Sequence, residues 1–88
     1  MKHDFTKQFK KDYAKRIVGT RMEAEFEELF DLLMGGEPLP ASYHDHMLVG
    51  DWKGYRDCHL RGDMVLIYKI VEDTVIFTRI NTHSELFG

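Results

Sequence analysis

A glycine pair and two prolines within residues 35–40 divide this 88-residue chain into halves with different hydrophobic periodicity. Glycine ends helices and proline cannot continue one, so no helix is expected to cross this segment. Before it, apolar residues recur every three or four positions, which is the period of an amphipathic helix. After it, short runs rich in β-branched and aromatic residues alternate with turn residues, as is typical of strands. The chain is therefore expected to join a helical half to a β half.

Two helices joined by a short turn are expected in the first half. An aromatic or aliphatic residue stands at every fourth position from Phe5 to Ile17, which predicts a helix that ends near Gly19. A second helix is predicted from Thr20, because Glu23 completes a capping box, and it ends at the glycine pair. A short strand can precede the first helix. Since each helix has one apolar face, both need a common partner to pack against.

Strand-like segments follow the prolines, and turn residues separate them. Tight turns are expected at Arg61-Gly62 and Glu72-Asp73, and a four-residue loop at 51–54. The apolar run Met64–Tyr68 predicts a central strand that is covered on both faces. The expected strands are 45–50, 55–60, 63–71 and 74–80. The predicted fold class is α+β, a single domain over residues 1–88 with an N-terminal helical hairpin packed on an antiparallel sheet of four to five strands.

Composition and charge narrow the class of protein further. With 88 residues, 43% of them hydrophobic, the chain can form one modest core. The net charge of −3 argues against a protein that coats nucleic acid, although residues 1–17 are basic and residues 18–37 acidic. The single cysteine, Cys58, excludes an internal disulfide framework. The absence of a signal-peptide pattern and of a long apolar run predicts a cytoplasmic protein with no membrane partner.

Four of the five histidines fall in the β half, so the hairpin registers decide whether they meet. The loop at 51–54 is expected to place His46 opposite His59. The two tight turns would then place His59 opposite Met64, and Met64 opposite Asn81. Because side chains alternate between faces, the next row on the same face is predicted to hold Leu48, Asp57, Leu66 and Arg79. His83 would follow at the open end of that face.

Several imidazoles and an arginine on one sheet face favour acid–base catalysis at a phosphate group. Imidazoles titrate near neutrality and suit general acid–base catalysis, and an arginine binds a phosphate. Phosphoryl transfer in RNA needs this combination, with one group to deprotonate a 2′-hydroxyl and another to protonate the leaving oxygen. We therefore expect a shared cleft at one end of the sheet, formed by His46, His59, Arg79 and His83. The alternative interpretation is a solvated face whose histidines have no catalytic role.

A metal site is the other chemistry that the histidines suggest. The spacing His44-x-His46 puts two imidazoles on one strand face, and His59 with Asp63 offers two further ligands. These residues complete no compact metal motif, so we expect no functional metal site. Cys58 alternates to the face opposite His59 and is interpreted as a small buried hydrophobic residue, not a nucleophile.

The second half of the chain also resembles a known family. The segments Pro38-Leu39-Pro40, Tyr43–Gly50 and Trp52–His59 follow the pattern of the YafQ branch of the RelE/ParE toxin superfamily. The pattern continues through Asp63, the run Leu66–Lys69, Arg79 and the segment Thr82–Phe87. The resemblance covers residues 38–88, in order and at the spacing of the family.

The resemblance implies a type II toxin that enters the ribosomal A site and cuts mRNA by 2′-hydroxyl attack, without a metal or other cofactor. In this interpretation Arg79 stabilises the charge on the phosphate, His46 or Asp63 is the base, His83 is the acid and His59 positions its neighbours. Phe87 is implied as a supporting residue, and Lys53, Arg56 and Met64 as substrate-binding residues. Close relatives often have tryptophan in place of Met64, which affects the expected codon preference. A two-residue turn at 61–62 would point Asp63 to the opposite face, and the sequence leaves its orientation open.

The implied partners are a cognate antitoxin and the ribosome with its A-site mRNA, while DNA is contacted only indirectly through the antitoxin. The hydrophobic and basic surface of the helical half is expected to receive the antitoxin. Two alternatives stay open. One is a ParE-like toxin that binds a topoisomerase without cutting RNA, and the other is an inactive homologue that only binds its antitoxin. The histidine cluster favours the nuclease, because a binding protein has no need of several groups that titrate near neutrality.

Overall fold

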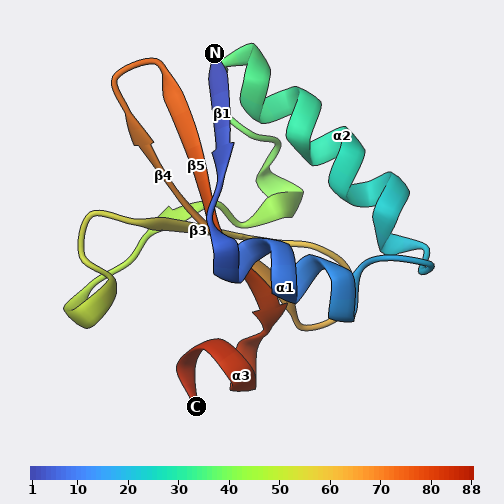
Figure 1. The fold of residues 1–88 in the computed structure, drawn as a ribbon. Helices are drawn as coiled ribbons and strands as arrows, with labels where there is room; N and C mark the ends of the chain where they lie inside the picture. Colours follow the sequence, from blue (N-terminus) through green and yellow to red (C-terminus); the bar gives the residue numbers. More distant parts are fainter.

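The structure, a computed structural model, describes residues 1–88 and confirms the α+β class. Both expected helices, all four expected strands and the possible short strand before the first helix are present, and one further helix lies at the C-terminal end (Figure 1). No helix combines the length and the hydropathy that a membrane span requires. In chain order the elements are β1 (Lys2–Phe5), α1 (Lys7–Arg16), α2 (Met22–Gly35), the 3-10 turn η1 (Ala41–Tyr43), β2 (His46–Met47), the 3-10 turn η2 (Gly50–Trp52), β3 (Arg56–His59), β4 (Met64–Val71), β5 (Thr74–Thr82) and α3 (His83–Phe87).

The five strands form one sheet in the order β1-β5-β4-β3-β2. Strands β2 to β5 form the expected antiparallel meander, while β1 runs parallel to β5 along its outer edge. The β1–β5 pairing runs only from Lys2 opposite Thr74 to Phe5 opposite Phe77. Beyond Phe77, the edge of β5 therefore has no neighbouring strand and faces α1.

The helices begin and end where local hydrogen bonds dictate. Thr6 caps α1, since its hydroxyl accepts a hydrogen bond from the Phe9 backbone N–H at 3.0 Å. Helix α2 begins at Met22, two residues later than predicted, because the Thr20 hydroxyl donates to the Ile17 carbonyl at 2.7 Å and accepts from the Met22 N–H. The predicted capping box is therefore wrong. The helix ends as expected at the glycine pair, where Gly36 has a left-handed φ of 75°.

Both faces of the central strand β4 are covered, as the apolar run predicted. On one face, Leu66 and Tyr68 join the main core with α1 and α2. On the other face, Val65 and Ile67 are fully buried in a smaller cluster with Leu86 of α3. Helix α3, which was not predicted, begins after Thr82, whose hydroxyl accepts from the Glu85 N–H at 3.3 Å. The smaller cluster is completed by Leu48, Trp52, Tyr55 and Phe87.

The strand registers differ from the prediction. His46 pairs with Asp57, not His59, and His59 pairs with Val65, not Met64. The β3–β4 turn has three residues, 61–63, because Leu60 donates to the Met64 carbonyl at 2.9 Å and Gly62 adopts a left-handed φ of 66°. The extra residue turns Met64 and Leu66 to the helical face.

A second irregularity reverses the effect of that turn. The β4–β5 register shifts by one residue between Ile67 and Tyr68, so Met64 pairs with Thr82, not Asn81. Near the turn, Val71 pairs with Thr74, as the two-residue turn requires. Because the extra turn residue and the register shift cancel, Arg79 still shares a face with His46 and His59, as predicted.

Candidate functional site

One row of paired residues crosses four strands on the face away from α2. Arg79 of β5 pairs with Ile67 of β4, Ile67 pairs with Asp57 of β3, and Asp57 pairs with His46 of β2. Residues paired across neighbouring strands point to the same face, so these side chains line one surface. The adjacent row on that face holds Asn81, Val65 and His59.

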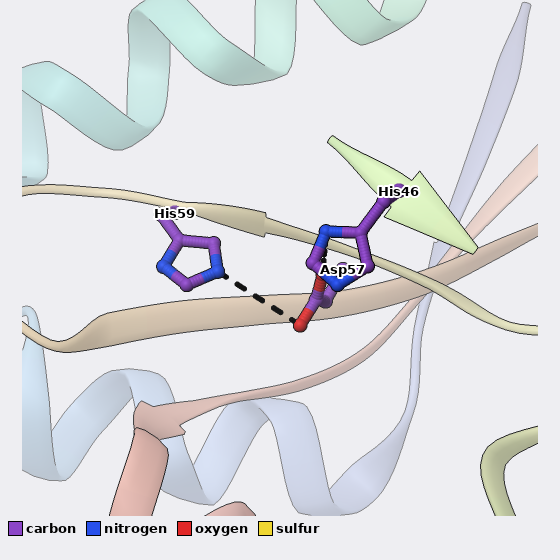
Figure 2. A group of neighbouring side chains, drawn as sticks. All are labelled: His46, Asp57 and His59. Carbon is purple, nitrogen blue, oxygen red and sulfur yellow. Dashed lines mark ion pairs between the residues drawn. The ribbon is translucent and has the colours of Figure 1, made fainter. Parts of the chain in front are cut away.

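Asp57 lies between two imidazoles, from His46 and His59, as Figure 2 shows. Its Oδ1 is 3.0 Å from His46 Nδ1, and its Oδ2 is 4.0 Å from His59 Nε2. The Asp57 side chain is only 4% exposed, whereas those of His46 and His59 are 57% and 31% exposed. A buried carboxylate is thus covered by two imidazoles that solvent or a substrate can reach.

Burial raises the pKa of Asp57 above its usual value, because a charged carboxylate loses hydration there. The neighbouring His46, His59 and His83 act in the opposite direction, but the net shift is upward. Oδ1 forms no hydrogen bond within the chain, and His46 Nδ1 is within hydrogen-bond distance of the His44 carbonyl oxygen, at 2.9 Å. The contact between Oδ1 and Nδ1 is an ion pair only when the His46 imidazole is protonated.

His83 and Phe87 belong to α3, at the end of the same face. The His83 ring lies 4.9 Å from the Phe87 ring, and the His83 backbone N–H donates to the Asp63 carbonyl at 2.9 Å. The backbone of the β3–β4 turn is thereby tied to the start of α3. The side chain of Asp63 is exposed in that turn.

The structure does not place Arg56 and Met64 with the histidines. Arg56 points to the helical face, where Nη2 and Nε donate to Asp45 at 2.8 and 3.2 Å, and the Tyr68 hydroxyl also donates to that carboxylate. Met64 is 6% exposed and belongs to the main core, because the three-residue turn reverses its direction. These positions do not support their predicted RNA contacts. Lys53 is exposed after η2.

The expected shared cleft is not one of the three surface hollows of the structure. None of the three surface hollows is lined by more than one of His46, His59, Arg79 and His83. His59 borders a hollow of about 330 Å³ together with Glu25, Glu28, Ser42, Tyr43, Leu60 and Arg61. The predicted role of Cys58 agrees with its place in the main core, where burial raises the pKa of its thiol.

Two residues of the site were not selected from the sequence. Asp57 was expected on the same face as the histidines, because it precedes His59 by two positions on one strand. This spacing could have marked Asp57 as a candidate site residue. Asp12 lies on α1 and binds Arg79, with Oδ2 at 2.7 Å from Arg79 Nε. Its signal was weaker: it is the one acidic residue within an otherwise basic helix, three positions after the core residue Phe9.

His46, Asp57 and His59 also offer the ligand set of a metal site. One ligand atom from each residue lies within 4.8 Å of the others. Two imidazoles and a carboxylate suit zinc or copper. The metal site considered from the sequence combined His46 and His59 with His44 and Asp63. In the structure, Asp57 replaces His44 and Asp63 in the group.

Comparison with known proteins identifies the family. Residues 1–88 match the family described as bacterial toxin of type II toxin–antitoxin system, YafQ. The mRNA interferase toxin YafQ of Escherichia coli K12 is 40% identical over 86 residues, which cover 97% of this chain and 94% of that protein.

Solved structures agree with this family. A copper-bound mutant toxin from Helicobacter pylori has a TM-score of 0.91 at 36% identity and covers 99% of both chains. A chain of the E. coli DinJ–YafQ complex has a TM-score of 0.79 at 39% identity, and the match covers 98% of this chain and 97% of that one. The chain therefore belongs to the YafQ family of bacterial toxins from type II toxin–antitoxin systems.

Proposed function

We propose that this chain is an endoribonuclease toxin that cleaves mRNA in the ribosomal A site, by metal-independent attack of a 2′-hydroxyl on the adjacent phosphate. The observation that carries the proposal is the buried Asp57 carboxylate between two accessible imidazoles, in a row that ends at Arg79. The name mRNA interferase toxin of the E. coli relative supports the same reaction. Cleavage of mRNA would stop translation in the cytoplasm.

His46 has the geometry of the general base. The His44 carbonyl oxygen, which can only accept a hydrogen bond, lies 2.9 Å from its Nδ1, so we assign the proton of the neutral imidazole to Nδ1. The Nε2 lone pair is then free, on a side chain that is 57% exposed, to accept the proton of a 2′-hydroxyl. Asp57 stabilises the imidazolium that forms, which is the role of the aspartate in Ser-His-Asp triads. Asp63, the other base considered, has an exposed side chain in a turn.

His83 and Arg79 would supply the remaining steps. The 2′-oxygen bonds to phosphorus as the bond from phosphorus to the 5′-oxygen breaks, and His83 donates a proton to that leaving oxygen. Arg79 would bind the non-bridging oxygens as negative charge builds on the phosphate. His59, whose ring is 6.3 Å from that of His46, would position its neighbour. The products are a 2′,3′-cyclic phosphate and a 5′-hydroxyl.

The proposed dependence on the ribosome is supported by two surface features, the lack of a common hollow at the site residues and the negative net charge. The four site residues line none of the three surface hollows together, and the net charge of −3 gives little general attraction to phosphate. The orientation of the RNA must then come from a second body, and an mRNA held in the ribosome can supply a large part of it.

This proposal is tested by comparing the cleavage of one RNA, free and bound to programmed ribosomes. We expect codon-dependent cleavage on ribosomes, negligible cleavage of the free RNA, and products with 2′,3′-cyclic or 3′-phosphate ends. Similar rates on both substrates would contradict the dependence on the ribosome. No cleavage of either would favour a toxin that binds another target, such as a topoisomerase, or an inactive homologue.

The partner would be a cognate antitoxin, as the DinJ–YafQ complex of E. coli supports, with DNA contacted only through it. On the helical half, an apolar groove of about 320 Å³ is lined by Phe5, Phe9, Tyr13 and Phe26 and bordered by Lys10. A groove of this kind fits an acidic segment with an apolar face.

Lys10→Glu should weaken the antitoxin complex about tenfold, because it places a negative charge beside an acidic segment. Lys2→Glu, at an exposed position outside the groove, is the control.

Binding of an inhibitory metal ion is a second candidate function, which the grouping of His46, Asp57 and His59 favours, since their ligand atoms lie within 4.8 Å of one another. The copper-bound relative from H. pylori is consistent with it. A copper or zinc ion at these residues would use the imidazole that the proposed reaction needs as a base. The ion would therefore act as an inhibitor and not as a cofactor.

Copper electron paramagnetic resonance tests this metal site without an activity measurement. One equivalent of Cu²⁺ should show hyperfine coupling to two imidazole nitrogens, and His59→Gln should reduce it to one. His3→Gln is the matched control, since His3 lies on β1 and packs against Phe5 and Phe30. Equal spectra for the wild type and His59→Gln would exclude His59 as a ligand.

A further inference from the structure

We infer that Asp12 is a positioning residue that fixes the guanidinium of Arg79 for the phosphate, an inference that rests on the proposed function of Arg79. Asp12 lies on α1 and Arg79 on β5, 67 positions apart in the chain. Arg79 Nε donates to Asp12 Oδ2 at 2.7 Å, and Arg79 Nη2 donates to Oδ1 at 3.2 Å. This two-pronged contact fixes the orientation of the guanidinium plane as well as its position.

The Asp12 carboxylate is itself held firmly. It accepts hydrogen bonds from the Ile80 backbone N–H, Asn81 Nδ2 and Gln8 Nε2, each at 3.2 Å. The Ile80 N–H is available because β1 ends at Phe5 and leaves this edge of β5 without a strand. Asp12 thus replaces a missing strand partner and holds Arg79 at the same time.

Both members of the pair are charged at neutral pH. Burial acts to raise the pKa of Asp12, but hydrogen bonds from Arg79, Gln8 and Ile80 outweigh it, and the pKa lies below its usual value. The same pairing raises the pKa of Arg79. The Asp12 side chain is 4% exposed and that of Arg79 is 24% exposed, so Arg79 is the more accessible member of the pair.

The contact leaves Arg79 able to bind a phosphate. A guanidinium has five N–H donors, and Asp12 occupies those of Nε and one of Nη2. The edge formed by Nη1 and the second Nη2 hydrogen stays free, and this edge can donate to two oxygens of one phosphate. Because the guanidinium is already ordered, little reorganisation is needed when charge develops on the phosphate.

Asp12→Asn tests the inference, since it keeps the size of the side chain and removes its charge. On programmed ribosomes we expect kcat to fall by about 10- to 100-fold while KM changes by less than about threefold, because Arg79 stays charged but loses its fixed orientation. In an Arg79→Gln background, Asp12→Asn should change kcat by less than about twofold. An equal loss in both backgrounds would show a purely structural role and overturn the inference.

The failure of the inference and of the proposed function can be told apart. If Arg79→Gln alone keeps full activity, the role of Arg79 in the proposed function is wrong, whatever Asp12 does. Asp73→Asn is the matched control, because the exposed Asp73 side chain contacts Lys2 at 3.7 Å and the Thr74 hydroxyl at 3.2 Å, and its kcat should equal that of the wild type.

A measurement on the wild-type protein covers the case in which Asp12→Asn does not fold. The Arg79 Nε–H should give a sharp nitrogen-15 NMR signal that exchanges with water at least about tenfold more slowly than that of the exposed Arg21. Exchange as fast as in Arg21 would show that the guanidinium is not held, and would overturn the inference.

Discussion

Asp57 and Arg79 flank the same residue: Ile67 of β4 pairs with Asp57 on one side and with Arg79 on the other. Neighbouring strands lie about 4.8 Å apart, so the two backbones are about 10 Å apart, with both side chains on one face. Ile67 is fully buried beneath a cluster that includes Leu86 and Phe87 of α3. The proposed acid, His83, and its aromatic neighbour, Phe87, therefore lie on the helix that covers Ile67, between the two charged residues.

Replacing Asp57 by asparagine should lower the cleavage rate without disturbing the sheet. Asn keeps the size of the side chain but cannot stabilise the imidazolium of His46, so we expect kcat to fall by about 10²- to 10⁴-fold. The measurement is single-turnover cleavage on programmed ribosomes, with circular dichroism as the control for folding. Unchanged kcat would remove Asp57 from the proposed mechanism.

The same variant should have a different dependence of stability on pH. Because the pKa of Asp57 is raised above 3.8, the folded state holds this proton more tightly than the unfolded state. The free energy of unfolding of the wild type should therefore contain a contribution that falls as the pH rises from 3.8 through the raised pKa. Urea unfolding from pH 4 to 7 should show this slope in the wild type and a smaller slope in Asp57→Asn. Equal slopes would mean that Asp57 does not titrate in this range.

His83→Ala should relieve the growth arrest that the toxin causes when expressed without its antitoxin. A general acid commonly contributes about 10²- to 10⁴-fold to the rate, and its loss would make expression tolerable. The readout is growth at equal toxin abundance, with His3→Ala on β1 as the matched control that still arrests growth. Arrest by His83→Ala as strong as by the wild type would exclude His83 from the chemistry.

The sequence predicted which side chains share a face of the sheet, but not which residues pair across neighbouring strands. Alternation along each strand placed His46 and His59 together, and this survives a register error of two residues. The three-residue β3–β4 turn and the register shift at Ile67/Tyr68 were both missed, and each moves the side chains that follow it to the opposite face of the sheet. The predicted face of Arg79 is correct only because the two errors cancel. Met64 lies between the two irregularities, so its predicted face was wrong.

The contact between Asp12 and Arg79 was beyond prediction for another reason. It joins residues 67 positions apart, and it depends on where β1 ends, which leaves the Ile80 N–H without a strand partner. Helix α3 was missed because five residues carry too little periodicity to show one. Local signals thus predicted most elements, while the site also depends on contacts between elements distant in sequence.

Arg56→Ala should affect stability and not catalysis. Arg56 donates to Asp45 through Nη2 and Nε on the helical face, and its loss leaves that partly buried carboxylate with the Tyr68 hydroxyl alone. Hydrogen bonds between charged groups contribute about 1.5–3 kcal/mol, so the free energy of unfolding should fall by about that amount. Below the unfolding temperature, kcat per folded molecule should stay within about twofold of the wild type. A large fall in kcat at full folding would restore Arg56 as a substrate contact.

Met64→Trp is the sharpest test of the corrected face of β4. If Met64 pointed to the site, an indole would stack on a base and change the codon preference. In the structure Met64 is 6% exposed within the main core, so the larger side chain must instead displace its neighbours. Overpacking of this kind typically costs about 1–3 kcal/mol, and we expect the free energy of unfolding to fall by that amount in urea titrations. The order in which the variant cleaves different A-site codons should stay the same as in the wild type. Met64→Leu, which nearly conserves volume, is the control and should change both properties little. A new codon preference with unchanged stability would show that residue 64 faces the RNA.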